Sequence, residues 1–143
     1  MEIRDIEAED LPICLEYLKE EWTHITGSER RKDNIARKME VAMIGEAGAV
    51  LMDGDKLVGF AVIEEGEAAI MLVSFYIAEG YRRGIANYLL MQYVMNFAGE
   101  RGIAYCSLHP NMTLPGSVCK NGSIDKNVVS RWLEVTKNRY EKG

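Results

Sequence analysis

Residues 75–90 read FYIAEGYRRGIANYLL: an apolar strand runs into a short loop and then directly into a helix. The loop carries Arg82 and Arg83, and Gly84 and Ala86 leave little side chain where the helix begins. The first turn of a helix presents unpaired N–H groups and the positive end of the helix dipole, which together bind anions. Arginines can add charge-assisted hydrogen bonds. This stretch therefore predicts a phosphate-binding site.

The loop follows neither of the two commonest phosphate-binding patterns. The P-loop pattern GxxxxGK[ST] is absent, and so is the dinucleotide pattern GxGxxG. A loop with glycine and arginine between a strand and a helix is also ordinary connecting structure. The order of the elements around it must therefore decide between a functional and a structural role.

On the N-terminal side of the loop, the pattern predicts a strand, two helices and three further strands. Alternating polarity marks the first strand, and apolar residues at helical spacing mark the helix that follows. The Asp53-Gly54-Asp55 turn joins two of the later strands as a hairpin. The expected ranges are 2–7 for the first strand, helices opening at 9 and spanning 29–44, and strands at 49–52, 57–64 and 68–77.

On the C-terminal side, a helix over 85–101 ends at Gly102, and a strand follows over 103–108. A strand–helix–strand unit places its two strands side by side and parallel. A last helix over 125–140 has Ser123 or Asp125 as its cap. The prediction is a single α/β (α+β) domain over 1–143, with a mixed, mostly antiparallel sheet flanked by helices in the order β-α-α-β-β-β-α-β-α.

Composition narrows the class of protein. The 143 residues are 48% hydrophobic and carry a net charge of −5, which is typical of a globular protein and argues against general nucleic-acid binding. The three cysteines, Cys14, Cys106 and Cys119, have no zinc-ligand spacing. No apolar run reaches the ~18 residues of a membrane span, and no signal peptide follows Met1. We expect a cytoplasmic protein without membrane contact.

This order of elements resembles the GNAT superfamily of acetyltransferases over roughly residues 1–111. The superfamily's loop has the pattern [Q/R]-x-x-G-x-[G/A], and Tyr81-Arg82-Arg83-Gly84-Ile85-Ala86 is similar to it. Gly84-Ile85-Ala86 matches the second half of the pattern. In the first half, either Tyr81 replaces the usual Gln or Arg, or Arg82 is that residue and the loop is one residue shorter.

The resemblance implies that acetyl-CoA is the co-substrate. A bulge in the strand before the loop would separate it from its parallel neighbour, and the pantetheine arm would bind in the gap. The residues that the resemblance assigns to the cofactor are Phe75, Ile77, Arg82, Arg83, Gly84, Ile85, Ala86 and Asn111. Asparagine after a proline is also common in turns, so Asn111 has an ordinary structural interpretation as well.

Transfer of an acetyl group to an amine needs a base for the amine proton and an acid for the thiolate. His109, Glu79 and Glu64 are the candidate bases, and His109 ranks first because it ends the strand that borders the cofactor. The family's acid is a tyrosine in a pattern that this chain lacks. Tyr140, the only tyrosine after Tyr105, is the candidate acid. Cys106 could carry an acyl group, although no motif supports that role.

The C-terminal part departs from the resemblance. The family usually adds two strands after the last helix, whereas here only a short strand within 114–120 is available. An open sheet edge invites pairing, so we expect a homodimer through the segment after Pro110. The function expected is acetyl transfer to an amine of a small molecule or protein. A catalytically silent CoA-binding regulatory module and an interaction protein without cofactor remain the alternatives.

Overall fold

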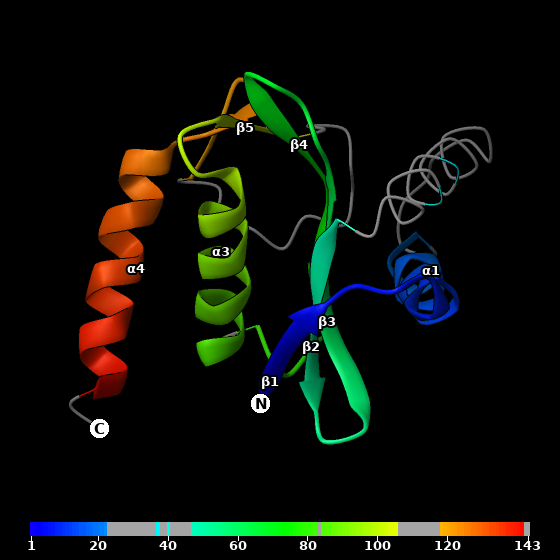
Figure 1. The fold of residues 1–143 in the computed structure, drawn as a ribbon. Coiled ribbons are helices and arrows are strands. Elements are labelled where there is room, and N and C mark those ends of the chain that lie inside the picture. The colour runs from blue at the N-terminus through cyan, green and yellow to red at the C-terminus, as the bar shows by residue number, and fades with distance from the viewer. Residues whose placement is uncertain (23–36, 38–39, 41–46, 83, 106–117, 142–143) are drawn as a thin grey trace.

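The computed structural model describes residues 1–22, 37, 40, 47–82, 84–105 and 118–141 (Figure 1). Its strands are β1 (Glu2–Asp5), β2 (Gly48–Asp53), β3 (Lys56–Glu64), β4 (Ala69–Ile77), β5 (Gly102–Tyr105), β6 (Cys119–Lys120) and β7 (Ser123–Ile124). Its helices are the 3-10 turn η1 (Ala8–Asp10), α1 (Leu11–Trp22), α3 (Ile85–Ala98) and α4 (Lys126–Glu141). The predicted helix over 29–44 lies outside the described residues.

The strands form one mixed sheet in the order β1-β2-β3-β4-β5-β7-β6. Every pair is antiparallel except β4 and β5, which run parallel, as the strand–helix–strand unit predicted. Helix α1 lies on one side of the sheet, and α3 and α4 lie on the other (Figure 1). The predicted α/β class with a mostly antiparallel sheet is therefore confirmed.

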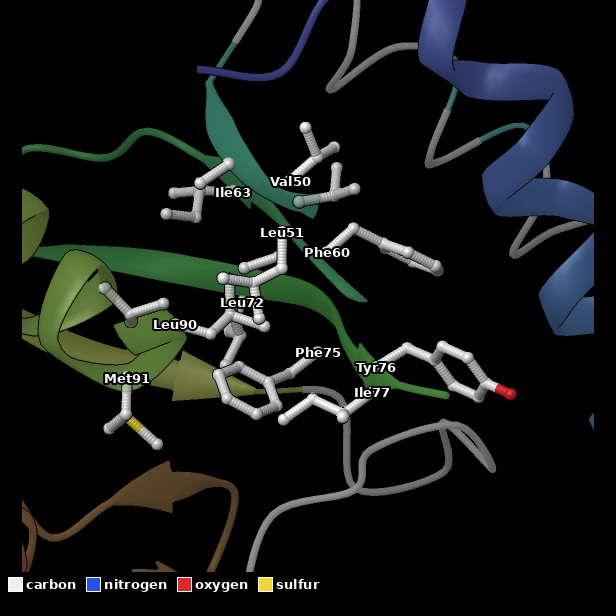
Figure 2. Close-up of a cluster of buried hydrophobic side chains, with 14 of the residues drawn as sticks. Val50, Leu51, Phe60, Ile63, Leu72, Phe75, Tyr76, Ile77, Leu90 and Met91 are labelled. Atoms are coloured by element: carbon white, nitrogen blue, oxygen red, sulfur yellow. The ribbon is translucent and has the colours of Figure 1, made fainter. Parts of the chain in front are cut away.

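The two central strands carry most of the core. β3 is buried without interruption from Leu57 to Ile63, and β4 is buried from Leu72 to Ile77. Strands covered on both faces read as continuous apolar runs, which is the pattern that the sequence showed at 68–77. Figure 2 shows how these side chains divide: Leu72 and Phe75 point to the side of Leu90 in α3, whereas Tyr76 points toward α1.

Helix α3 ends earlier than the sequence predicted. The expected stop was Gly102, but the helix ends at Ala98, and Gly99 takes φ = 61° while its N–H donates to the Met95 carbonyl at 3.1 Å. Glycine adopts this conformation without the steric penalty of a Cβ atom, so it is the usual residue after a helix end. Gly102 instead opens β5, where its N–H donates to the Ala68 carbonyl at 3.1 Å.

A short hairpin covers β5, which corrects the expectation of an open sheet edge. β7 pairs antiparallel with β5 through Ala104 and Ser123, and the Tyr105 N–H donates to the Gly122 carbonyl at 2.9 Å. Asn121 and Gly122, with φ of 51° and 79°, make the tight turn between β6 and β7. The two strands thus come before the last helix rather than after it. The homodimer stays a prediction, but the open edge at β5 on which it was based is not present, because β7 pairs with β5.

Helix α4 begins where one of the two predicted caps places it. The Asp125 carboxylate accepts hydrogen bonds from the N–H groups of Asn127 and Val128, at 3.0 and 3.2 Å. A side-chain acceptor at this position satisfies donors that the first turn leaves unpaired. The helix packs against α3 and runs in the opposite direction, with Val129 fully buried (Figure 1).

An ion pair fixes the chain where β1 turns into the first helical segment. Arg4 makes two hydrogen bonds to the Asp10 carboxylate, at 2.9 and 2.8 Å, and the Glu7 N–H donates to the same carboxylate at 2.8 Å. Burial alone would raise the pKa of Asp10, but the bonds from Arg4 and Glu7 outweigh it and hold that pKa below its usual value. The strand consequently ends at Asp5 rather than at residue 7.

Candidate functional site

Strand β4 continues for five residues beyond its described pairing with β5. The parallel pairing runs from Ala69 to Leu72 of β4, and Leu72 lies opposite Tyr105. At this point the register with β3 shifts, because Val62 faces Ser74 while Ile63 faces Leu72. The extra residue, Val73, makes a β-bulge, which bends a strand and increases its twist. Beyond Leu72, no described residue of β5 pairs with β4.

The alternation of hydrogen bonds along β4 shows which of its main-chain groups point away from β3. They point to the side of β4 on which the described pairing with β5 has ended, which we call the open edge of β4. The Ala78 N–H donates to the Val58 carbonyl at 2.8 Å, so this directly opposed pair is hydrogen-bonded. In an antiparallel ladder such pairs alternate, so Tyr76 also bonds to β3. The main-chain groups of Phe75 and Ile77 then point away from β3. These are the two residues that the resemblance assigned to the pantetheine arm.

The loop after β4 is held from two directions. The Tyr81 hydroxyl donates to the Asp53 carboxylate at 2.8 Å, which ties the loop to the β2–β3 hairpin. This hydrogen bond is the main reason why the pKa of Tyr81 is raised. From the other direction, the Asn87 side-chain amide donates to the Arg82 carbonyl at 2.6 Å, which ties the loop to α3. Tyr81 and Arg82 are therefore each tied to a neighbouring element of the fold.

Helix α3 begins in the form expected of an anion site. Gly84 precedes the helix with nearly extended backbone, φ = 158° and ψ = −155°, and it has no side chain that could cap the first turn. Ile85 is 39% exposed and Ala86 is buried at 1%. Uncapped first-turn N–H groups are the donors that bind phosphate at helix starts. Arg83 lies outside the described residues.

Arg82 lies back along the end of β4. Its Nε donates to the Ile77 carbonyl at 2.8 Å, and its guanidinium lies 5.5 Å from the centre of the Tyr76 ring. The Ile77 carbonyl is one of the groups on the open edge. A carbonyl oxygen has two lone pairs, so Arg82 leaves one position for a further donor.

On the α1 side of the sheet, aromatic side chains fix β4 in place. The ring centres of Tyr17 and Tyr76 are 5.2 Å apart, and those of Phe60 and Tyr76 are 5.5 Å apart. The Tyr17 hydroxyl donates to the Leu57 carbonyl. Figure 2 shows Phe60 and Tyr76 directed to the side of α1. This packing holds β4 from one side while α3 holds it from the other.

Ser74 is the residue of this region that sequence reasoning missed. Its side chain is completely buried, and none of the described residues supplies a hydrogen-bond partner for its Oγ. The available signal was a small hydroxyl residue within the apolar run 69–77. The bulge at Val73 left no such signal, because a bulge arises only from the pairing of two strands.

Among the described residues, the structure brings none of the predicted catalytic candidates together. His109, Asn111 and Cys106 lie outside the described residues. Glu79 is exposed just past β4, and Glu64 is exposed at the other end of the β3–β4 hairpin. The remaining candidate, Tyr140, falls in the last turn of α4, so the long axis of that helix separates it from the β7 end of the sheet.

Two negative findings apply to the described part of the chain. None of its helices is long and apolar enough to cross a membrane. It also contains no cluster of three or more His, Cys, Asp or Glu side chains suited to a metal ion. The described residues therefore supply no metal centre to the candidate site.

The fold is that of solved acetyltransferases. PaiA N-acetyltransferase from Thermoplasma acidophilum, in complex with coenzyme A, is similar over 86% of this chain and 94% of its own, with a TM-score of 0.58 and 13% identity. A possible acetyltransferase from Clostridium difficile 630 is similar over 93% and 88%, with a TM-score of 0.56 and 18% identity. A putative acetyltransferase from Staphylococcus aureus Mu50 is similar over 76% and 81%, with a TM-score of 0.55 and 21% identity.

No protein-family model and no curated protein sequence matches the chain. The similarity is therefore one of structure, and it shows that the chain has the GNAT-type acetyltransferase fold. The resemblance drawn from the loop and from the order of elements is confirmed at this level.

Proposed function

We propose that this chain is an N-acetyltransferase that takes the acetyl group from acetyl-CoA. The observation that carries the proposal is the geometry of β4 beyond Leu72, where its described pairing with β5 ends and a β-bulge bends the strand. On the side away from β3, no described strand pairs with the main chain of Phe75 and Ile77, and β4 leads into a helix start at Gly84 that has no side-chain cap. A row of amide-binding groups that ends at an anion site suits a molecule with an amide-containing arm and a diphosphate.

The cofactor residues follow from this arrangement. Phe75 and Ile77 would pair with the pantetheine amides, and the N–H groups at Gly84, Ile85 and Ala86 would bind the diphosphate. Arg82 and Arg83 add positive charge, and Asn111 would contact the cofactor from the β5 side. This assignment is supported by a solved acetyltransferase of similar fold whose structure contains coenzyme A. When bound, acetyl-CoA supplies an activated acyl group as a thioester.

The proposed catalytic groups are His109 as base and Tyr140 as acid. A histidine with a reference pKa of about 6.5 can accept the proton of an amine near neutral pH. His109 would stand four residues past Tyr105, at the end of the strand that is proposed to border the cofactor. Tyr140 has weaker support because α4, at about 1.5 Å per residue, carries it roughly 20 Å from the β7 end of that helix.

The acceptor is an amine of a small molecule or a protein. The net charge of −5 favours cationic acceptors and disfavours nucleic acid as a partner. We place the reaction in the cytoplasm, where Cys14 and Cys119, which form no disulfide, would stay reduced.

A catalytically silent CoA-binding module is the second candidate, and one observation favours it. The sequence lacks the family's tyrosine pattern, which would supply the acid for the thiolate. Such a module would bind the cofactor and pass the signal to a partner protein. An interaction protein that binds no cofactor is the remaining alternative.

Release of CoA thiol separates these candidates. Acetyl-CoA should be tested with a panel of polyamines, amino acids, aminoglycosides and peptide N-termini, with parallel binding measurements by calorimetry. Thiol release that depends on one acceptor class supports the enzyme. Binding without turnover on the whole panel supports the regulatory module, and absence of binding supports the interaction protein.

A further inference from the structure

Ser74 is a buried hydroxyl in an apolar position. It is completely inaccessible to solvent, it lies directly opposite Val62 of β3, and the described residues offer its Oγ no hydrogen-bond partner. Burying a hydroxyl without a partner destabilises a folded protein, so nearly all buried polar groups in native structures are paired. An alanine or valine would fill this position at lower cost. The hydroxyl therefore needs an explanation other than packing.

The position of Ser74 connects it with the open edge of β4. It directly follows the bulge at Val73, and it lies two residues beyond Leu72, the last residue paired with β5. It also directly precedes Phe75, whose main chain faces the open edge. Side chains alternate along a strand, so Ser74 shares the α1 side of the sheet with Tyr76. The hydroxyl, which has no partner among the described residues, thus lies just beyond the described pairing of β4 with β5.

A serine hydroxyl can donate one hydrogen bond and accept two. A ligand group that accepts a hydrogen bond at this point would satisfy the hydroxyl donor of Ser74. Acetyl-CoA has such a group in its thioester carbonyl, and free CoA lacks it. We propose that the Ser74 hydroxyl donates to the acyl carbonyl oxygen of the thioester, and that it thereby distinguishes acetyl-CoA from CoA. This inference rests on the proposed function and deepens it.

The same hydrogen bond would favour the chemical step. The neutral amine nitrogen attacks the carbonyl carbon, a C–N bond forms, and negative charge develops on the oxygen that Ser74 contacts. The C–S bond then breaks as that oxygen returns its electron pair. The nitrogen gives up one proton to the base, and the sulfur leaves as thiolate and takes one proton. A donor aimed at the oxygen is worth more as its charge grows.

Ser74→Ala tests the inference because a ligand-binding role and a structural role predict opposite effects. If the hydroxyl has no partner in the free protein, its removal leaves the melting temperature equal to or above that of the parent. Calorimetry should show acetyl-CoA binding weakened about 3- to 10-fold, with CoA binding unchanged. Thiol release should fall by roughly 10²-fold, as for loss of an oxyanion donor.

Val62→Ala is the matched control, because Val62 faces Ser74 across the β3–β4 ladder and is equally buried. It should lower the melting temperature and leave the ratio of acetyl-CoA to CoA affinity unchanged. An unchanged ratio in Ser74→Ala would overturn the assignment while leaving CoA binding in place. So would a clear loss of melting temperature, which would show that the hydroxyl has a structural partner. A parent protein that binds neither molecule would overturn the proposed function itself.

Discussion

Arg82 donates a hydrogen bond through Nε to the main-chain carbonyl of Ile77 at 2.8 Å. The side chain predicted to bind phosphate therefore contacts a group predicted to bind pantetheine. If Arg82 reaches the diphosphate in the complex, Arg82→Gln should weaken acetyl-CoA binding about 10-fold, since one charged hydrogen bond is lost. Binding by the variant should also depend less on salt, because fewer charges are screened. Calorimetry at two salt concentrations measures both; tighter binding by Arg82→Gln would mean that Arg82 blocks the site.

Gly84 lies where a diphosphate would approach the first turn of α3. We expect Gly84→Val to abolish measurable CoA binding while the far-UV circular dichroism stays that of the parent, because a branched side chain there would obstruct the N–H groups. Gly102→Ala is the control, since a Cβ at Gly102 would make only ordinary contacts, with the Ala69 Cβ at 3.7 Å and the Ala68 carbonyl oxygen at 3.9 Å, and Gly102 follows the opposite end of α3. Gly84→Val with parental affinity would place the phosphate site elsewhere.

The Arg4–Asp10 pair should make the free energy of unfolding depend on pH in the acidic range. Asp10 has a lower pKa in the folded chain than its value of about 3.9 when unfolded. The stabilisation is therefore complete above about pH 5 and is lost as the pH falls through the folded-state pKa. Asp10→Asn should lower the free energy of unfolding by about 1 kcal/mol at neutral pH, and by less near pH 3.

Urea unfolding of both proteins across that pH range measures the difference. Glu9→Gln changes an exposed neighbour and should match the parent at neutral pH. An Asp10→Asn deficit that is the same at pH 3 and pH 7 would contradict the role of ionisation.

Substitutions of His109 and Tyr140 test the two proposed proton-transfer roles separately. His109→Ala should lower turnover at least roughly 10-fold, a cautious floor for loss of a general base, while acetyl-CoA affinity stays close to the parent value. Tyr140→Phe should have the smaller effect, because Tyr140 ends α4. The assay is thiol release with the best acceptor of the panel. Full turnover in His109→Ala would assign the base to a carboxylate or to water.

The sequence predicted the elements that are defined within one segment, by hydrophobic periodicity and by capping or turn residues at the ends. The apolar run 68–77 became β4 at Ala69–Ile77, and the cap Asp125 was found at the start of α4. Gly102 was predicted to end α3, but Gly99, which suits a helix end equally well, follows the last helical residue. The choice depended on where β5 begins to pair with β4.

The features that define the candidate site depend on pairing between distant segments. The bulge at Val73 exists only through its register with Val62 and Ile63. The burial of Ser74, whose Oγ has no partner among the described residues, arises only when the elements pack around β4. A short strand was expected within 114–120, where β6 lies at Cys119–Lys120, but β7 and its pairing with β5 were missed because two residues are too few for any periodicity. Local sequence patterns carry none of this information.

Acetyl-CoA binding tests the central claim most directly, and a melting curve with calorimetry measures it. At 100 times its dissociation constant, a ligand specific for the folded state stabilises it by about 2.7 kcal/mol. For a domain of this size, at roughly 3–5 °C per kcal/mol, the melting temperature should rise by on the order of 10 °C. Gly84→Val should show no rise. The account predicts that shift together with a measurable heat of binding; no shift at millimolar acetyl-CoA, and no heat, would contradict it.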